Sequence, residues 1–91
     1  MSAEYPYTYK QTSTADAETV LRAFPGKLAY VLITTKAAGS LTLRDDLATG
    51  GSNIIAVIDT NAADFMDYEA WFNRGLTYAK TGTAAVTICY L

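Results

Sequence analysis

Apolar and polar positions follow a period near two over several short runs of the chain, and this pattern predicts β-strands. Three runs, at 27–35, 54–58 and 84–91, carry apolar side chains on both parities. Such a run predicts a strand that is buried on both faces, either between two sheets or between two subunits. The run at 41–44 alternates apolar and polar residues, as a half-exposed strand does.

The rest of the chain consists of shorter elements. Residues 15–24 fit either a helical turn capped by Asp16 or a short strand at 19–22. Extended structure is predicted again at 68–73 and at 76–78. Turn signals recur at intervals of about ten residues, which gives about six to eight short strands. This pattern predicts an all-β fold, a compact antiparallel β-sandwich or jelly-roll-like domain over 15–91.

An extended N-terminal arm over 1–14 precedes that domain. It carries Tyr5, Tyr7 and Tyr9 at a period of two, so an extended segment places the three rings on one side. Pro6 excludes a central position in a sheet. Two interpretations remain open: an edge strand whose rings cover the core, or an arm that lies on a neighbouring subunit.

The segment at 72–91 is expected to form two strands around a Thr81-Gly82 turn, as a closing hairpin. Just before it, Trp71 and Phe72 are adjacent, so their rings must point to opposite faces of a strand. One ring belongs to the core, and the other, if it lies outside, marks a contact patch. The predicted partner interface therefore consists of the three arm tyrosines with Tyr68, Trp71 and Phe72.

Composition favours association between subunits. A single domain of 91 residues builds a thin core, and the lone Cys89 excludes an internal disulfide. Oligomerisation is the remaining means of stabilisation that we expect. The net charge of −2 argues against a nucleic-acid partner, and no apolar run approaches the roughly 20 residues of a membrane span.

The residues that carry chemistry are few. The chain has no histidine, which excludes Ser-His and Cys-His nucleophilic pairs, and Cys89 is expected to be buried and inert. Five aspartates fall in predicted loops, where turn formation is the first interpretation and a structural cation or catalysis the alternatives. We therefore predict a protein that is not an enzyme and needs no cofactor or metal. These aspartates are Asp45, Asp46, Asp59, Asp64 and Asp67.

Three short patterns follow one another within residues 27–91. The first is an Ala-Gly-Ser-Leu-Thr-Leu turn and strand at 38–43 with a following Asp45, and the second is an Ile-rich strand at 54–59. The third is Phe72, two residues, Gly-Leu, and then a Thr-Gly-Thr turn with a Val-Thr strand ending in Tyr90. With these patterns, residues 27–91 resemble small structural proteins of tailed bacteriophages.

The resemblance implies a β-sandwich module of the virion, assembled in the cytoplasm of the bacterial host. It implies a capsid decoration or cement protein that works as a homo-oligomer, with a trimer favoured, on the major capsid protein or other virion proteins. The alternative is a head, neck or tail fibre module that binds a receptor or a carbohydrate. In that alternative Tyr68, Trp71 and the loop aspartates would contact the sugar.

Overall fold

The computed structural model describes residues 7–47, 53–62 and 64–91, and within these ranges it contains eight strands and no helix. The strands confirm the predicted all-β class. Accordingly, no helix in the described residues is long and apolar enough to cross a membrane. The strands are β1 (Thr8–Thr12), β2 (Asp16–Arg22), β3 (Gly26–Thr35), β4 (Ser40–Arg44), β5 (Ile54–Asp59), β6 (Phe65–Phe72), β7 (Leu76–Lys80) and β8 (Ala85–Tyr90).

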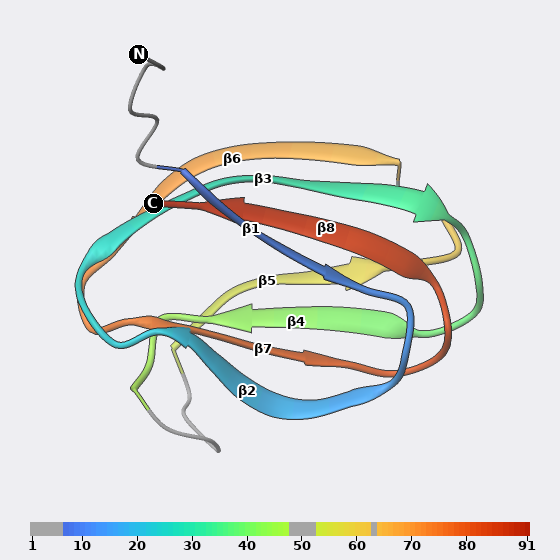
Figure 1. The fold of residues 1–91 in the computed structure, drawn as a ribbon, viewed down its shortest axis with the longest axis horizontal. Coiled ribbons are helices and arrows are strands. Elements are labelled where there is room, and N and C mark those ends of the chain that lie inside the picture. Colours follow the sequence, from blue (N-terminus) through green and yellow to red (C-terminus); the bar gives the residue numbers. More distant parts are fainter. Residues whose placement is uncertain (1–6, 48–52, 63) are drawn as a thin grey trace, which may run out of the picture.

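The strands form two antiparallel sheets of four strands each (Figure 1). Sheet A has the order β1-β8-β3-β6, and sheet B has the order β2-β7-β4-β5. Of these eight strands, β4 and β5 are the only chain neighbours that share a sheet, so the chain otherwise crosses from one sheet to the other after each strand. This interleaving is the jelly-roll form of the β-sandwich.

The predicted closing hairpin is wrong, although both of its strands exist. β7 pairs with β2 and β4 in sheet B, whereas β8 pairs with β1 and β3 in sheet A. The reason lies in the side chains, because Tyr78 of β7 and Ile88 of β8 both belong to the single core between the sheets. The two runs therefore pack face to face across the core and do not pair edge to edge.

In the N-terminal half, both regions for which the sequence left a strand as one of two alternatives contain a strand. The segment that could have been a helical turn is β2, which pairs with β7 through two bulges. Residues Thr8–Thr12 form the edge strand β1, which pairs with β8 from Thr8↔Tyr90 to Thr12↔Val86. Tyr5 and Pro6 lie outside the described residues.

The core is formed by the inward side chains of both sheets. Phe72, the last residue of β6, is 1% exposed there. The neighbouring Trp71 is 70% exposed, so the expected opposition of these two rings is confirmed. The other large members of the core are Leu28, Val31, Ile33, Leu41, Leu43, Ile58, Leu76, Tyr78, Val86, Ile88 and Tyr90.

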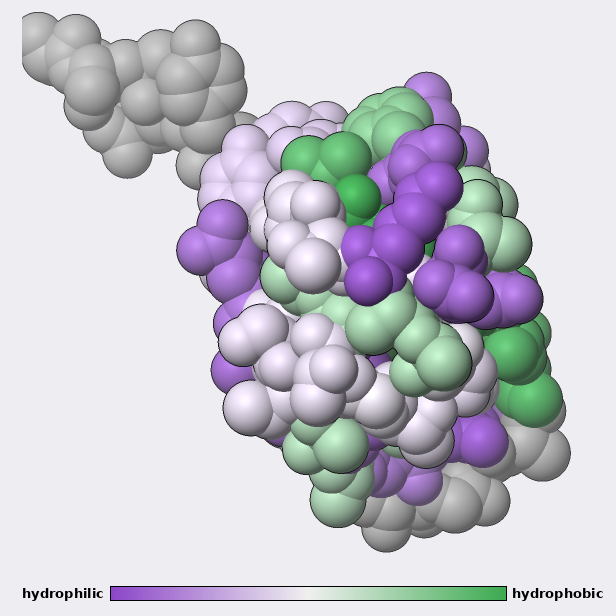
Figure 2. Space-filling view, turned by 90° about the vertical axis from the view of Figure 1, so that its right-hand side faces the viewer, coloured by the Kyte–Doolittle hydropathy of each residue, from purple (hydrophilic) through white to green (hydrophobic). Residues whose placement is uncertain are grey.

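Two of the connections that cross between the sheets interlock through glycines. Gly82 has φ 78°, in the left-handed region, and a Cβ added there would lie 2.1 Å from the carbonyl oxygen of Ala38. Gly39 approaches Thr81 equally closely, and the amide of Thr81 donates to the carbonyl of Ser40 at 2.9 Å. Figure 2 shows this end of the sandwich, where pale, weakly polar side chains lie between purple hydrophilic areas and smaller green apolar ones.

A buried polar cluster links the connection between β1 and β2 to strand β7 through hydrogen bonds. Lys80 is 2% exposed, and its Nζ donates to the carbonyl oxygens of Thr14 at 2.7 Å and Gly82 at 2.9 Å. The hydroxyls of Thr12 at 2.6 Å and Tyr78 at 2.7 Å donate to the carboxylate of Asp16. These hydrogen bonds, that of Thr12 first, lower the pKa of Asp16 below its usual range.

The adjacent rings of β6 provide a matched test of the core. Phe72→Ala removes a buried ring and is expected to lower the free energy of unfolding by about 3–5 kcal/mol. Trp71→Ala removes an exposed ring and is expected to change it by at most about 1 kcal/mol. Urea unfolding followed by circular dichroism measures both. Equal losses in the two variants would contradict the assignment of Phe72 to the core.

The cluster around Asp16 predicts a specific response to acid. The pKa of Asp16 is lower in the folded than in the unfolded chain, so its carboxylate stabilises the fold above the unfolded pKa, near 4. That contribution is lost as the pH falls through the folded pKa. We expect Asp16→Asn to be less stable than the parent at pH 7, with the difference shrinking towards pH 2, in urea titrations at each pH. A difference that is independent of pH would refute this role.

Candidate binding surface

The outer face of sheet A, which points away from the core, carries a row of aromatic rings. The rings of Tyr9 on β1 and Tyr30 on β3 have centroids 6.5 Å apart, and those of Tyr30 and Phe65 on β6 are 5.3 Å apart. Tyr7, which directly precedes β1, lies beside Tyr9, and Trp71 lies on β6. Tyr7, Tyr9, Phe65 and Trp71 are exposed, and Tyr30 is half-buried. We call Tyr7, Tyr9, Tyr30, Phe65 and Trp71 the aromatic surface.

Trp71 is held at one end of this surface by charged neighbours. The Nζ of Lys27, which is opposite Trp71 in the β3–β6 ladder, lies 5.5 Å from the ring centroid of Trp71. Lys27 also forms an ion pair with Glu69, which raises the pKa of Lys27. Glu69 itself has φ 48°, an uncommon conformation for a residue other than glycine, next to an irregularity in the β3–β6 pairing. Irregularities of this kind re-aim side chains, here at the end of β6 that carries Trp71.

A cavity of about 310 Å³ lies beneath part of the aromatic surface. Tyr9 and Tyr30 line it, and Cys89 of the intervening strand β8 lies in it at 1% exposure. A hydrogen bond with Tyr9, and then burial, raise the pKa of Tyr30 to about 12. The aromatic rings thus cover the outer side of β8, and the thiol is part of the packing beneath them.

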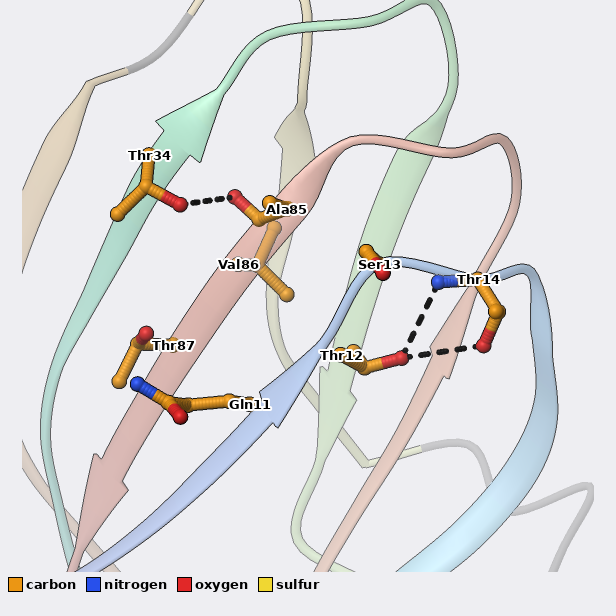
Figure 3. Close-up of a pocket in the computed structure, with 8 residues that line it drawn as sticks. All are labelled: Gln11, Thr12, Ser13, Thr14, Thr34, Ala85, Val86 and Thr87. Atoms are coloured by element: carbon orange, nitrogen blue, oxygen red, sulfur yellow. Dashed lines mark hydrogen bonds between the residues drawn. The ribbon is translucent and has the colours of Figure 1, made fainter.

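A second depression, of about 490 Å³, opens at the opposite end of the same face (Figure 3). It forms where β1 ends at Thr12 and where β8 begins at Ala85, after the chain has crossed from β7 of sheet B. In Figure 3 the side chain of Gln11 reaches across towards Thr87, its direct partner in the β1–β8 ladder. The lining residues are Gln11, Thr12, Ser13, Thr14, Thr34, Ala85, Val86 and Thr87, and we call this site the hydroxyl depression.

Some of the hydroxyls there are already engaged. Thr34 Oγ1 donates to the carbonyl of Ala85 at 3.2 Å, and Thr12 and Thr14 both donate to Asp16. Among the described residues, the side chains of Gln11, Ser13 and Thr87 have no hydrogen-bond partner, and Thr87 is only 9% exposed.

Three of the loop aspartates have the expected role in turns. The carboxylate of Asp45 accepts hydrogen bonds from the backbone amides of Asn73, Arg74 and Gly75, and these bonds lower its pKa although burial alone would raise it. Asp46 accepts from the backbone and side chain of Asn53.

Asp59 is the third of these, because its carboxylate accepts from the amide of Asn61. The other two aspartates are in different settings: Asp64 pairs with Lys36, and Asp67 lies on β6 opposite Tyr30. In the described part of the chain, no group of three or more acidic, histidine or cysteine side chains is placed to hold a metal ion.

The structure brings together only some of the residues that the sequence predicts at a partner interface. Tyr7, Tyr9 and Trp71 share the outer face of sheet A. Tyr68 is half-buried and packs against the core, and Phe72 lies within the core. The sequence did not reveal four further residues on the outer face of sheet A, because their positions there follow from pairings between strands that are distant in the sequence. These residues are Gln11, Tyr30, Phe65 and Thr87. The chain matches no protein-family model, no curated protein and no solved structure.

The aromatic row predicts that Tyr30 ionises late. The pKa values of Tyr30 and Tyr78 are both raised to about 12, whereas an unperturbed tyrosine ionises near pH 10. In an alkaline titration followed by absorbance at 295 nm, Tyr30→Phe should remove one late-ionising group. Tyr9→Phe should move the Tyr30 transition towards pH 10. A titration curve that Tyr30→Phe alters only near pH 10 would show that the two rings do not interact.

Proposed function

We propose that this chain is a non-enzymatic structural protein of a tailed-bacteriophage virion, a capsid decoration protein that stabilises the head as a homo-oligomer, with a trimer favoured. The observation that carries the proposal is the aromatic surface. It consists of rings on one face of a sheet whose other face already fills the core, and all of them except the half-buried Tyr30 are exposed. Exposed aromatic groups of this kind mark contact surfaces more often than catalytic ones.

The chemistry of the surface suits a contact between proteins. Tyrosine and tryptophan combine a large apolar ring with a polar atom, and they are enriched among the residues that contribute most to binding. Trp71 is 70% exposed and Tyr9 is 58% exposed, so a partner would remove most of their ring area from water. Burial of about 100 Å² of such area contributes about 2.5 kcal/mol.

The small size of the domain supports a role that depends on repetition. A sheet face of four short strands supplies a modest contact area, and one such contact is weak. A symmetric oligomer that binds a symmetric shell repeats the contact many times, and the combined binding is then far stronger than each contact alone. The jelly-roll architecture is also one that viral capsid proteins use, which agrees with the resemblance of residues 27–91 to phage structural proteins.

The distribution of polar groups gives no competing support for catalysis. The chain has no histidine, and the aspartates of the described loops are engaged with backbone amides or with basic side chains. Cys89 is buried under the rings of Tyr9 and Tyr30.

The proposal predicts self-association and shell binding that depend on the aromatic surface. In sedimentation velocity, the purified protein is expected to run as an oligomer, and it should co-sediment with phage shells stripped of it. The double variant Tyr9→Ala, Trp71→Ala should weaken shell binding by at least about tenfold, since each tenfold corresponds to 1.4 kcal/mol. Val57→Ala, which changes an exposed residue of sheet B, is the matched control. A monomer that does not bind shells would exclude the proposed function.

A further inference from the structure

The hydroxyl depression differs in chemistry from the aromatic surface beside it. None of its lining residues carries a formal charge, and six of the eight have a side-chain hydroxyl or amide. Hydroxyls and the glutamine amide can each donate and accept hydrogen bonds. A site for phosphate or sulfate would need basic side chains, and a cation site would need carboxylates. The lining therefore suits a neutral ligand that itself carries both donors and acceptors.

Three polar side chains in the depression remain available to such a ligand. Gln11, Ser13 and Thr87 have no partner among the described residues, and Thr87 is nine-tenths buried at the base of the depression. A polar group held in that position, without a partner in the protein, is satisfied either by water or by a ligand. The volume of about 490 Å³ lies within the usual range for small-molecule sites.

One aromatic ring lies near these polar groups, outside the lining of the depression. Tyr9 is two residues before Gln11 on β1, so its ring stands on the same face of the sheet. A sugar ring presents hydroxyls at its edge and C–H groups on its faces, so a saccharide that extends from the depression along β1 can contact both the polar lining and this ring. A purely apolar ligand would leave Gln11 and Thr87 unpaired.

We infer that the hydroxyl depression binds a neutral saccharide, with Gln11 and Thr87 as its principal hydrogen-bonding residues and Tyr9 at its border. This position differs from the sugar contact that the sequence suggested, which involved Tyr68 and the loop aspartates. The lining of the site contains no residue of the aromatic surface that carries the proposed shell contact, although Tyr9 of that surface borders it. The site would serve to attach the protein to a glycan.

The test is a titration of the ¹⁵N-labelled protein with maltotriose, cellotriose and chitotriose, up to about 10 mM because weak sites have dissociation constants near that range. Before the titration, the protein is screened on an array of neutral and acidic glycans, and any neutral glycan that binds is added to the three titrated saccharides. At least one neutral saccharide is expected to shift the amide signals of residues 11–13, 34 and 85–87 selectively. Gln11→Ala and Thr87→Val should each raise its dissociation constant about tenfold.

Matched controls separate this site from general effects. Thr42→Val, on β4 of sheet B, makes the same chemical change as Thr87→Val and should leave saccharide binding unchanged. Gln11→Ala should leave the sedimentation behaviour unchanged, so failure of the saccharide site and failure of the oligomer proposal are distinguishable. The inference is overturned if no neutral glycan binds, if the shifts centre on Trp71, if acidic glycans are preferred, or if both variants bind as the parent does.

Discussion

The two sheets share a single core, and they can do so only because the chain turns sharply from one sheet into the other. At one end of the sandwich this depends on the close approach of two crossing connections, with Gly39 against Thr81 and Gly82 against Ala38. A side chain at either glycine would meet a backbone carbonyl. The turns allow β7 and β8 to face each other across the core. They also set the outer face of sheet A, since β1 and β3 flank β8 there.

The strands were largely predictable because burial leaves a period of two in the sequence. The doubly apolar run that contains β8 has a specific cause. Its inward residue Ile88 faces the core, while its outward residue Cys89 is flanked by Tyr9 and Tyr30 on the neighbouring strands. The second buried face therefore comes from rings of the same sheet, and neither a third layer nor a subunit is needed to explain it.

The pairing of the strands could not be predicted in the same way. Periodicity states which side chains share a face of one strand, but not which strands are neighbours. A short turn such as that at Thr81-Gly82 fits a hairpin as well as a crossing, and only the shared core decides between them. For the same reason Gln11 and Thr87, which are 76 positions apart, look like ordinary polar residues in the sequence and meet only through the β1–β8 ladder.

The position of β8 also has a consequence for the making of the protein. Residues 85–90 supply an inner strand of sheet A, and β1 has no partner in the sheet other than β8. A nascent chain must therefore carry its first strand unpaired until residue 90 has left the ribosome. Contacts between such distant segments close late and slow folding. During synthesis Tyr9 of β1 is exposed together with an open strand edge, and this is the stage at which the chain is most open to premature association with its own copies.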